Sequence, residues 1–177
     1  IIAKAAKEII QKNGYDKKIT LINKKSTRLI VGKDLPTKAD VVISEVLSAE
    51  FVGEGVRTTI QDANTRLLKD DGKMIPESGN IMIALLSSSE DIKDKISVEN
   101  VSGYDLSIFN SITSQKVSLN VKPKLLSGAY EAFHISLYDS KNVAKLEKIV
   151  SLKVIKSGLC LGVIQWLKVQ LFANIEY

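Results

Sequence analysis

Three glutamates interrupt an otherwise apolar stretch, ISEVLSAEFVGEG, at residues 43–55. Glu45 and Glu54 lie nine residues apart, and Gly53 and Gly55 flank the second of them. Glycine lets the chain turn sharply, so the second carboxylate can return beside the first. Two ionised carboxylates held close together repel one another, and desolvation destabilises them further. A guanidinium would relieve that repulsion, because it is always charged and donates paired hydrogen bonds to carboxylates.

The alternative is that these acids belong to a solvated loop, where charged side chains are usually found. However, the preceding run VVI at 41–43 is continuously apolar, which is typical of a strand buried on both faces of a parallel sheet. Glu45 follows the carboxyl end of this predicted strand, 39–44, and ligands bind at that edge of open α/β sheets. We therefore expect Glu45 and Glu54 to form a site, and Glu50 to be structural or exposed.

The elements around this segment are predicted to follow an α/β order. Apolar residues recur with helical spacing over 1–13, and Asn13-Gly14 supplies the left-handed stop expected after a helix. The further predictions are a strand at 19–22, an extended stretch to Val31, the strand at 39–44, a helix at about 56–69 ended by DDG at 70–72, and a buried strand at 81–86. The second helix is expected to turn inward Ile60, Ala63, Leu67 and Leu68.

The character of the sequence changes after Ser87, where the polar linker SSSED begins. The residues beyond it contain short β-like runs: KVSLNV, FHISLY, VSLKVI and VIQWLKVQLF. A helical rhythm over 104–112 interrupts them, and His134 is interpreted as a structural residue on one of the β runs. A second, mostly β, domain is therefore predicted.

The composition of the whole chain excludes several function classes. A chain of 177 residues with 45% apolar residues can build a core, so disorder is not expected. The net charge of +5 comes mainly from scattered lysines, which do not require a nucleic-acid partner. One cysteine, Cys160, and one histidine allow neither an intramolecular disulfide nor a zinc site, so no metal is expected and a reducing interior fits best. The longest apolar runs are too short for a membrane helix.

The segment ISEVLSAEFVGEG resembles the double-glutamate loop of protein arginine methyltransferases, in which a strand ending in Ser/Thr-Glu is followed nine residues later by a second Glu. INKKST at 22–27 and GEG at 53–55 are most similar to the type III branch, the seventh mammalian enzyme, or to its relative the ninth. Four longer segments resemble the helix and strand after the ribose-binding acid, the last sheet strand, the start of the dimerisation arm and the late barrel strands: AKAAKEIIQKNGYDKKITLI, KMIPESGNIMIALL, NVSGYDLSIFNS and GLCLGVIQWLKVQLF.

The resemblance implies an α/β plus β fold. Residues 1–86 would be the back half of a class I, Rossmann-like methyltransferase domain, and 87–177 an incomplete β-barrel substrate-binding domain with a helical dimerisation arm at about 104–122. It also implies methyl transfer from S-adenosylmethionine to arginine in protein substrates, with Glu45 and Glu54 gripping the guanidinium. Ser26 and Thr27 match the turn that contacts the adenine of the cofactor, although the main branch carries Glu where Thr27 stands. A plain polar β-turn is the open alternative for this pair.

The chain departs from the family pattern in what it lacks. The glycine-rich loop, the ribose-binding acid and the Thr-His-Trp motif are not in this sequence. The chain opens inside a helical pattern without a start methionine or a signal peptide, so we expect a fragment that does not catalyse by itself. Val46-Leu47 stand where the main branch has Trp-Met, which leaves the product pattern open.

The expected partners are arginine-containing protein substrates and a second copy in a homodimer or pseudo-dimer, in the cytoplasm or also the nucleus, with no membrane. Two other functions stay open. One is a catalytically inactive family member that serves as a dimeric scaffold. The other is a basic nucleic-acid-binding module, which only the charge favours and which the scarcity of arginine (three residues) argues against.

Overall fold

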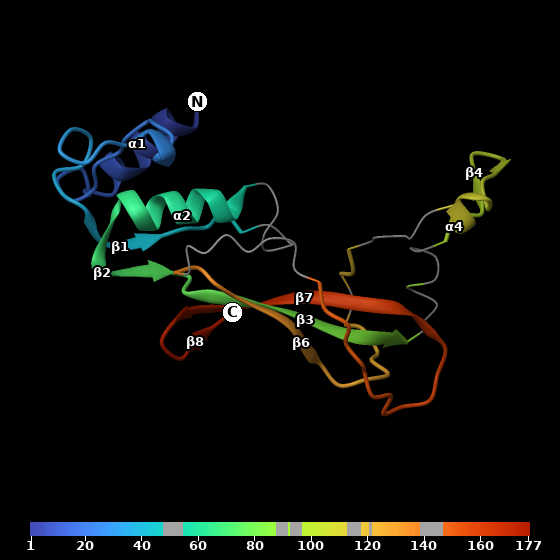
Figure 1. Ribbon diagram of the computed structural model, residues 1–177. Coiled ribbons are helices and arrows are strands. Elements are labelled where there is room, and N and C mark those ends of the chain that lie inside the picture. The colour runs from blue at the N-terminus through green and yellow to red at the C-terminus, as the bar shows by residue number, and fades with distance from the viewer. Residues whose placement is uncertain (48–54, 88–91, 93–96, 113–117, 121, 139–146) are drawn as a thin grey trace. The chain divides into compact units, whose positions relative to one another are not determined.

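The computed structural model describes residues 1–47, 55–87, 92, 97–112, 118–120, 122–138 and 147–177 (Figure 1). The chain forms two compact units. The first comprises Ile1–Ser78, Ser136–Asn142 and Val169–Tyr177, and the second comprises Gly79–Ile135 and Val143–Lys168. The first unit therefore takes in two short segments from late in the sequence. The domain boundary at 86/87 stays a prediction.

The first helix, α1, spans Ile2–Lys12 and ends where the sequence predicted. Asn13 is its C-cap, and Gly14 follows with a φ of +71°, a left-handed conformation that glycine adopts without steric cost. The side chain of Asn13 also donates to the carbonyl of Ile9 at 2.8 Å. The apolar residues Ile2 and Ile9 are exposed, so α1 is specified here by its local pattern and its C-terminal cap rather than by a buried face.

The prediction of a strand at 19–22 is wrong, because this segment has no regular secondary structure and no ladder partner among the described residues. A short 3₁₀ helix, η1, follows at Ser26–Arg28. The second extended stretch is also reduced, since Val31 makes only an isolated parallel bridge to Leu35. A β pattern in sequence becomes a strand only where a neighbouring strand accepts its backbone hydrogen bonds.

A parallel strand pair with a connecting helix forms the centre of the first unit. Strand β1 (Ala39–Ile43) pairs with β2 (Leu68–Ile75), and helix α2 (Val56–Arg66) lies between them in sequence. Figure 1 shows α2 running beside the two strands. The predicted strand at 39–44 and the start of the predicted helix at 56 are confirmed.

The sequence predicted that DDG at 70–72 ends the second helix. This prediction is wrong, because DDG lies inside β2. The helix ends earlier, at Arg66. The register explains the difference: Ala39 pairs with Leu68, whereas Val41 pairs with Lys73, so the residues between form an irregularity in the ladder. DDG is a sequence typical of turns, but here it forms a bulge in a strand that pairs with β1, and the chain does not reverse its direction.

The core of the first unit lies along the inner side of α2 and β2. The four residues predicted to face inward are all buried: Ile60, Ala63, Leu67 and Leu68. Val56 and Met74, which were not predicted, are buried with them. The prediction that β1 is buried on both faces is wrong, because Val41 is 47% exposed and Ile43 76% exposed. A strand is buried on both faces only where other elements cover both of them, and the exposed and half-buried residues along β1 show that its faces are not covered in this way.

A four-stranded sheet has the order β6-β3-β7-β8. Its strands are β3 (Ser78–Ser87), β6 (Tyr130–Ser136), β7 (Cys160–Phe172) and β8 (Ile175–Glu176). The strand predicted at 81–86 is confirmed within β3, but only Ala84 and Leu86 of it are buried. The β-like runs FHISLY and VIQWLKVQLF coincide largely with β6 and β7, whereas VSLKVI contributes a single bridge, between Val154 and Ser127. Half of KVSLNV, at 116, 117 and 121, lies outside the described residues, and 118–120 form no strand.

The helical rhythm predicted over 104–112 is only partly confirmed. A small antiparallel pair, β4 (Asn100–Val101) and β5 (Tyr104–Asp105), comes first, and the short helix α4 (Phe109–Ile112) follows it. Asn110 secures this excursion, because its side chain accepts from the amide of Val98 at 2.8 Å and donates to the carbonyl of Val98 at 2.7 Å. In the described part of the chain, helices are too short or too polar to cross a membrane.

Candidate active site

Glu45 lies just beyond the carboxyl end of β1, where the sequence predicted it. The strand ends at Ile43, and the amide of Ser44 still donates to the carbonyl of Ile75 at 2.8 Å, which holds the chain against the end of β2. Glu45 is then exposed. A carboxylate in this place can meet a ligand that approaches the strand ends. Glu50 and Glu54 lie outside the described residues, so the predicted pairing of Glu45 with Glu54 stays a prediction.

Gly55 turns the chain immediately after Glu54. Its φ of +76° is left-handed, and it is the N-cap residue of α2. The carbonyl of Gly55 accepts from the hydroxyl of Thr58 at 2.8 Å and from the amide of Thr59 at 3.0 Å. A side chain at this φ would be strained. Gly55 therefore has a conformation that favours glycine over other residues.

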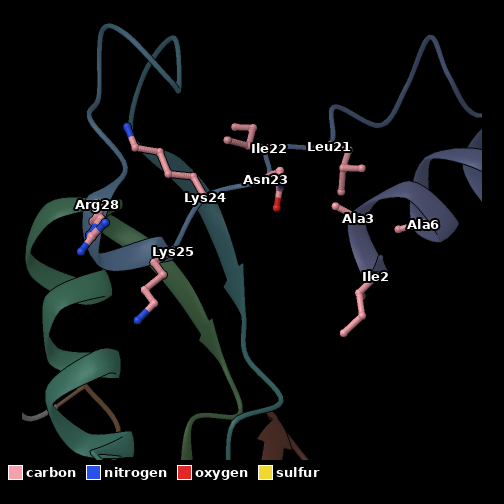
Figure 2. A pocket seen from close by; sticks show the side chains of 9 residues that line it. All are labelled: Ile2, Ala3, Ala6, Leu21, Ile22, Asn23, Lys24, Lys25 and Arg28. Carbon is pink, nitrogen blue, oxygen red and sulfur yellow. The ribbon is translucent and has the colours of Figure 1, made fainter.

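Ser26 and Thr27, the predicted adenine contacts, lie in η1 and are exposed. They stand beside an open pocket of about 600 Å³ but do not line it. Figure 2 shows the pocket between the N-terminal part of α1 and the segment that leads into η1. Its lining consists of apolar side chains, one amide and three cations: Ile2, Ala3, Ala6, Leu21, Ile22, Asn23, Lys24, Lys25 and Arg28.

Asp34 closes the loop that follows η1. One of its carboxylate oxygens, Oδ2, accepts from Lys24 Nζ at 2.5 Å and from the amide of Ile30 at 2.8 Å. The hydrogen bond from Lys24, followed by that from Ile30, lowers the pKa of Asp34 below its ordinary value. Because Lys24 also lines the pocket, this bond ties the pocket wall to the loop behind it.

Arg66, at the end of α2, makes a second connection to the same segment. Its Nε and Nη2 donate to the two carboxylate oxygens of Asp62, at 2.7 and 2.5 Å. Its Nη1 donates to the carbonyl of Leu29 at 2.6 Å, and Nη2 donates to the carbonyl of Ser26 at 3.1 Å. The hydrogen bond between Asp62 and Arg66 lowers the pKa of Asp62 and raises the pKa of Arg66.

The sequence analysis predicted neither the ion pair of Arg66 with Asp62 nor the bonds of Arg66 to the η1 segment. Asp62 and Arg66 are four residues apart on a helix, so their ion pair could have been expected. The reach of Arg66 to Ser26 and Leu29 had no local signal, because these residues lie 40 and 37 positions earlier in the sequence.

The pair of Asp62 and Arg66 predicts a pH dependence of stability. The folded state lowers the pKa of Asp62 from its ordinary value of 3.8. The stabilisation is therefore fully present above pH 3.8 and is lost as the pH falls through the lower folded value. We expect Asp62→Asn to melt at lower temperature than the wild type at pH 6, and the difference to shrink by pH 3. Melting curves at both values test this, with the exposed Asp16→Asn as control; a difference that does not change with pH contradicts the prediction.

His134 lies on β6, as predicted for a strand residue. It is exposed, and its Nδ1 is 2.6 Å from Oδ1 of Asn80 on β3. Within the described ranges, His, Cys, Asp and Glu side chains do not gather in groups of three that could hold a metal ion. Cys160 is an exposed free thiol at the start of β7.

Comparison with known proteins finds arginine methyltransferases that are similar to this chain in sequence. No family model matches the chain. It is 33% identical over 115 residues to an arginine N(omega)-methyltransferase of Streptomyces achromogenes subsp. streptozoticus, covering 65% of this chain and 32% of that protein. The chain is related to the arginine methyltransferases. Over 89 residues it is 38% identical to protein arginine N-methyltransferase 1.6 of Arabidopsis thaliana (50% and 12% covered) and 35% identical to protein arginine N-methyltransferase 7 of Rattus norvegicus (49% and 13%).

Solved structures of arginine methyltransferases share the fold of this chain. The Trypanosoma brucei PRMT1 enzyme-prozyme heterotetrameric complex with AdoHcy matches with a TM-score of 0.61 and 23% identity, over 79% of this chain and 44% of that one. Arabidopsis thaliana protein arginine methyltransferase 10 matches with a TM-score of 0.64 and 18% identity, over 94% and 54%. The fold class implied by the resemblance is confirmed. The matches span a third or less of the curated arginine methyltransferases.

Proposed function

We propose that the full-length protein transfers a methyl group from S-adenosylmethionine to a guanidinium nitrogen of arginine in protein substrates. The observation that carries this proposal is the exposed carboxylate of Glu45 at the carboxyl end of β1, in a chain related to arginine methyltransferases. The left-handed Gly55 directly after Glu54 supports a loop that returns the second carboxylate toward the first.

The two glutamates would act by positioning and by charge. Two carboxylates that accept paired hydrogen bonds from one guanidinium fix its plane and direct one terminal nitrogen. They also stabilise the positive charge of the guanidinium as the nitrogen forms its new bond. The methyl donor would supply a methyl group on a sulfonium sulfur: as the arginine nitrogen forms its N–C bond the C–S bond would break, S-adenosylhomocysteine would leave as the neutral thioether, and the nitrogen would give up one proton to solvent. Neither glutamate has to transfer a proton for this role, so Glu45 and Glu54 bind and orient the arginine.

The pocket beside η1 fits the adenine end of the donor. Leu21, Ile22 and Ala6 offer an apolar surface for a flat ring, and Asn23 offers an amide for its polar edge. Ser26 and Thr27 follow on the same segment and would add hydroxyl or backbone contacts. Lys24, Lys25 and Arg28 are positively charged and would repel the sulfonium, so we assign only the neutral adenine end of the donor to this pocket.

The arm proposed at about 104–122 would pair with a second copy or a related chain. Four apolar side chains of β5, α4 and the residues before α4 are exposed: Tyr104, Ile108, Phe109 and Ile112. Such a group of exposed apolar side chains is typical of an interaction surface. The Trypanosoma brucei relative forms a heterotetramer. A catalytically inactive scaffold would use the same surface, so this feature does not separate the two functions.

Methyl transfer to matched peptides tests the proposal. The full-length protein is incubated with S-adenosylmethionine that carries a labelled methyl group and with two peptides that differ only in one residue, arginine or lysine. We expect label in the arginine peptide alone, and calorimetric binding of S-adenosylhomocysteine. An inactive scaffold would neither label a peptide nor bind S-adenosylhomocysteine, and label in the lysine peptide would contradict the role of the glutamates.

A further inference from the structure

We infer that Arg66 is a positioning residue for the methyl donor, because it fixes the η1 segment against the end of α2. This inference rests on the proposed function, since it assigns to Arg66 the alignment of the segment that would meet the adenine. Arg66 would act through the backbone of Ser26 and Leu29, and would not itself contact the donor.

The geometry of Arg66 differs from that of an ordinary surface ion pair. Three of its nitrogens are used, and two of the hydrogen bonds end on backbone carbonyls at either end of η1. The carbonyl of Ser26 also accepts from the amide of Leu29 at 3.0 Å, which closes the 3₁₀ turn. The turn is therefore closed by its own hydrogen bond, and Arg66, from another element of the same unit, binds it at both ends.

Asp62 prepares Arg66 for this role. The carboxylate accepts from Nε and Nη2, so the plane of the guanidinium is set before it meets the turn. The side chains are 35% exposed for Arg66 and 28% for Asp62, so water can replace a lost bond but cannot restore the alignment. The ammonium of lysine has three donors on a single nitrogen and no planar fork, so it cannot make the four hydrogen bonds that Arg66 makes to Asp62, Ser26 and Leu29.

The segment that Arg66 grips forms one wall of the pocket. Lys24 and Lys25 precede η1 and Arg28 ends it, and all three line the pocket. The bond between Lys24 and Asp34 anchors this wall at one place, and Arg66 anchors it at another. Loss of Arg66 would leave the wall free to shift relative to α1, which supplies the opposite wall (Figure 2). Binding of the donor should then weaken, while the arginine site at Glu45 keeps its place.

Three variants of the full-length protein test this inference. Arg66→Met should raise the Kd for S-adenosylhomocysteine and the KM for S-adenosylmethionine about tenfold, because it removes hydrogen bonds from a charged donor. The kcat at saturating donor and the KM for an arginine peptide should stay within about twofold. Asp62→Asn, which leaves both carbonyl bonds possible, should give a smaller rise. Arg66→Lys should fail to restore the affinity, because it keeps the charge but not the fork.

Lys69→Met is the matched control. It removes an ion pair of the same unit that has no bond to η1, the exposed contact between Lys69 and Asp40 at 2.6 Å. We expect it to lower the melting temperature less than Arg66→Met does, because the pair is exposed, and to leave the donor affinity unchanged. Donor affinity that is unchanged in Arg66→Met, or equally weakened in Lys69→Met, overturns the inference. If Arg66→Met does not fold, the Kd of Arg66→Lys and of Asp62→Asn for S-adenosylhomocysteine tests the inference instead. A wild type that neither binds S-adenosylhomocysteine nor methylates arginine would instead refute the proposed function.

Discussion

Replacing Glu45 by glutamine is expected to lower kcat/KM for an arginine peptide by about 10² to 10³ in the full-length protein, the range found when one electrostatic contact to a reacting group is removed. Glutamine keeps the size of the side chain and one oxygen but loses the charge. The substitution should leave the affinity for S-adenosylhomocysteine unchanged, because Glu45 lies at the end of β1 and does not line the pocket beside η1.

Glu54→Gln should give a loss of similar size, and the double variant should be little worse than either single one, because groups that act as a unit are strongly non-additive. Glu8→Gln is the matched control, an exposed glutamate on α1 that should keep full activity. Peptide methylation rates and calorimetry measure both quantities. Full activity of Glu45→Gln would refute the role assigned to the pair.

Met74→Ala is expected to lower the free energy of unfolding by about 2 to 5 kcal/mol, the usual cost of truncating a fully buried methionine. Met74 has no exposed surface, and it pairs with Val42 in the centre of the parallel ladder. Its amide also donates to the hydroxyl of Tyr138 at 2.9 Å, so the backbone is held and cannot easily move to fill the space left by the side chain.

The control for this cavity is Ile43→Ala on the neighbouring strand. Ile43 pairs with Ile75 in the same ladder but is 76% exposed, so its truncation should cost no more than about 0.5 kcal/mol. Urea unfolding curves of both variants against the wild type give the two free energies. Equal losses, or a loss below about 1 kcal/mol for Met74→Ala, would show that the region around β1 and β2 repacks freely.

Features with a local physical cause could be predicted from the sequence. Helix α1 and its end follow from helical spacing and from Asn13-Gly14, which form without distant partners. Strand β1, which ends two residues before Glu45, and the start of α2 after Gly55 follow in the same way from an apolar run and a glycine. The segment ISEVLSAEFVGEG also resembles the double-glutamate loop of arginine methyltransferases, to which the chain is related.

Features that depend on distant partners could be decided only by the tertiary structure. The pattern at 19–22 predicts a strand, but no described strand pairs with it. The turn-like DDG at 70–72, in contrast, is part of β2, because the backbone groups of β1 pair with this strand. The hydrogen bonds of Arg66 to Ser26 and Leu29 join residues about 40 positions apart. Local spacing sets which conformation a segment prefers, but a backbone hydrogen bond to a distant segment is more decisive, because a polar group without a partner is costly to bury.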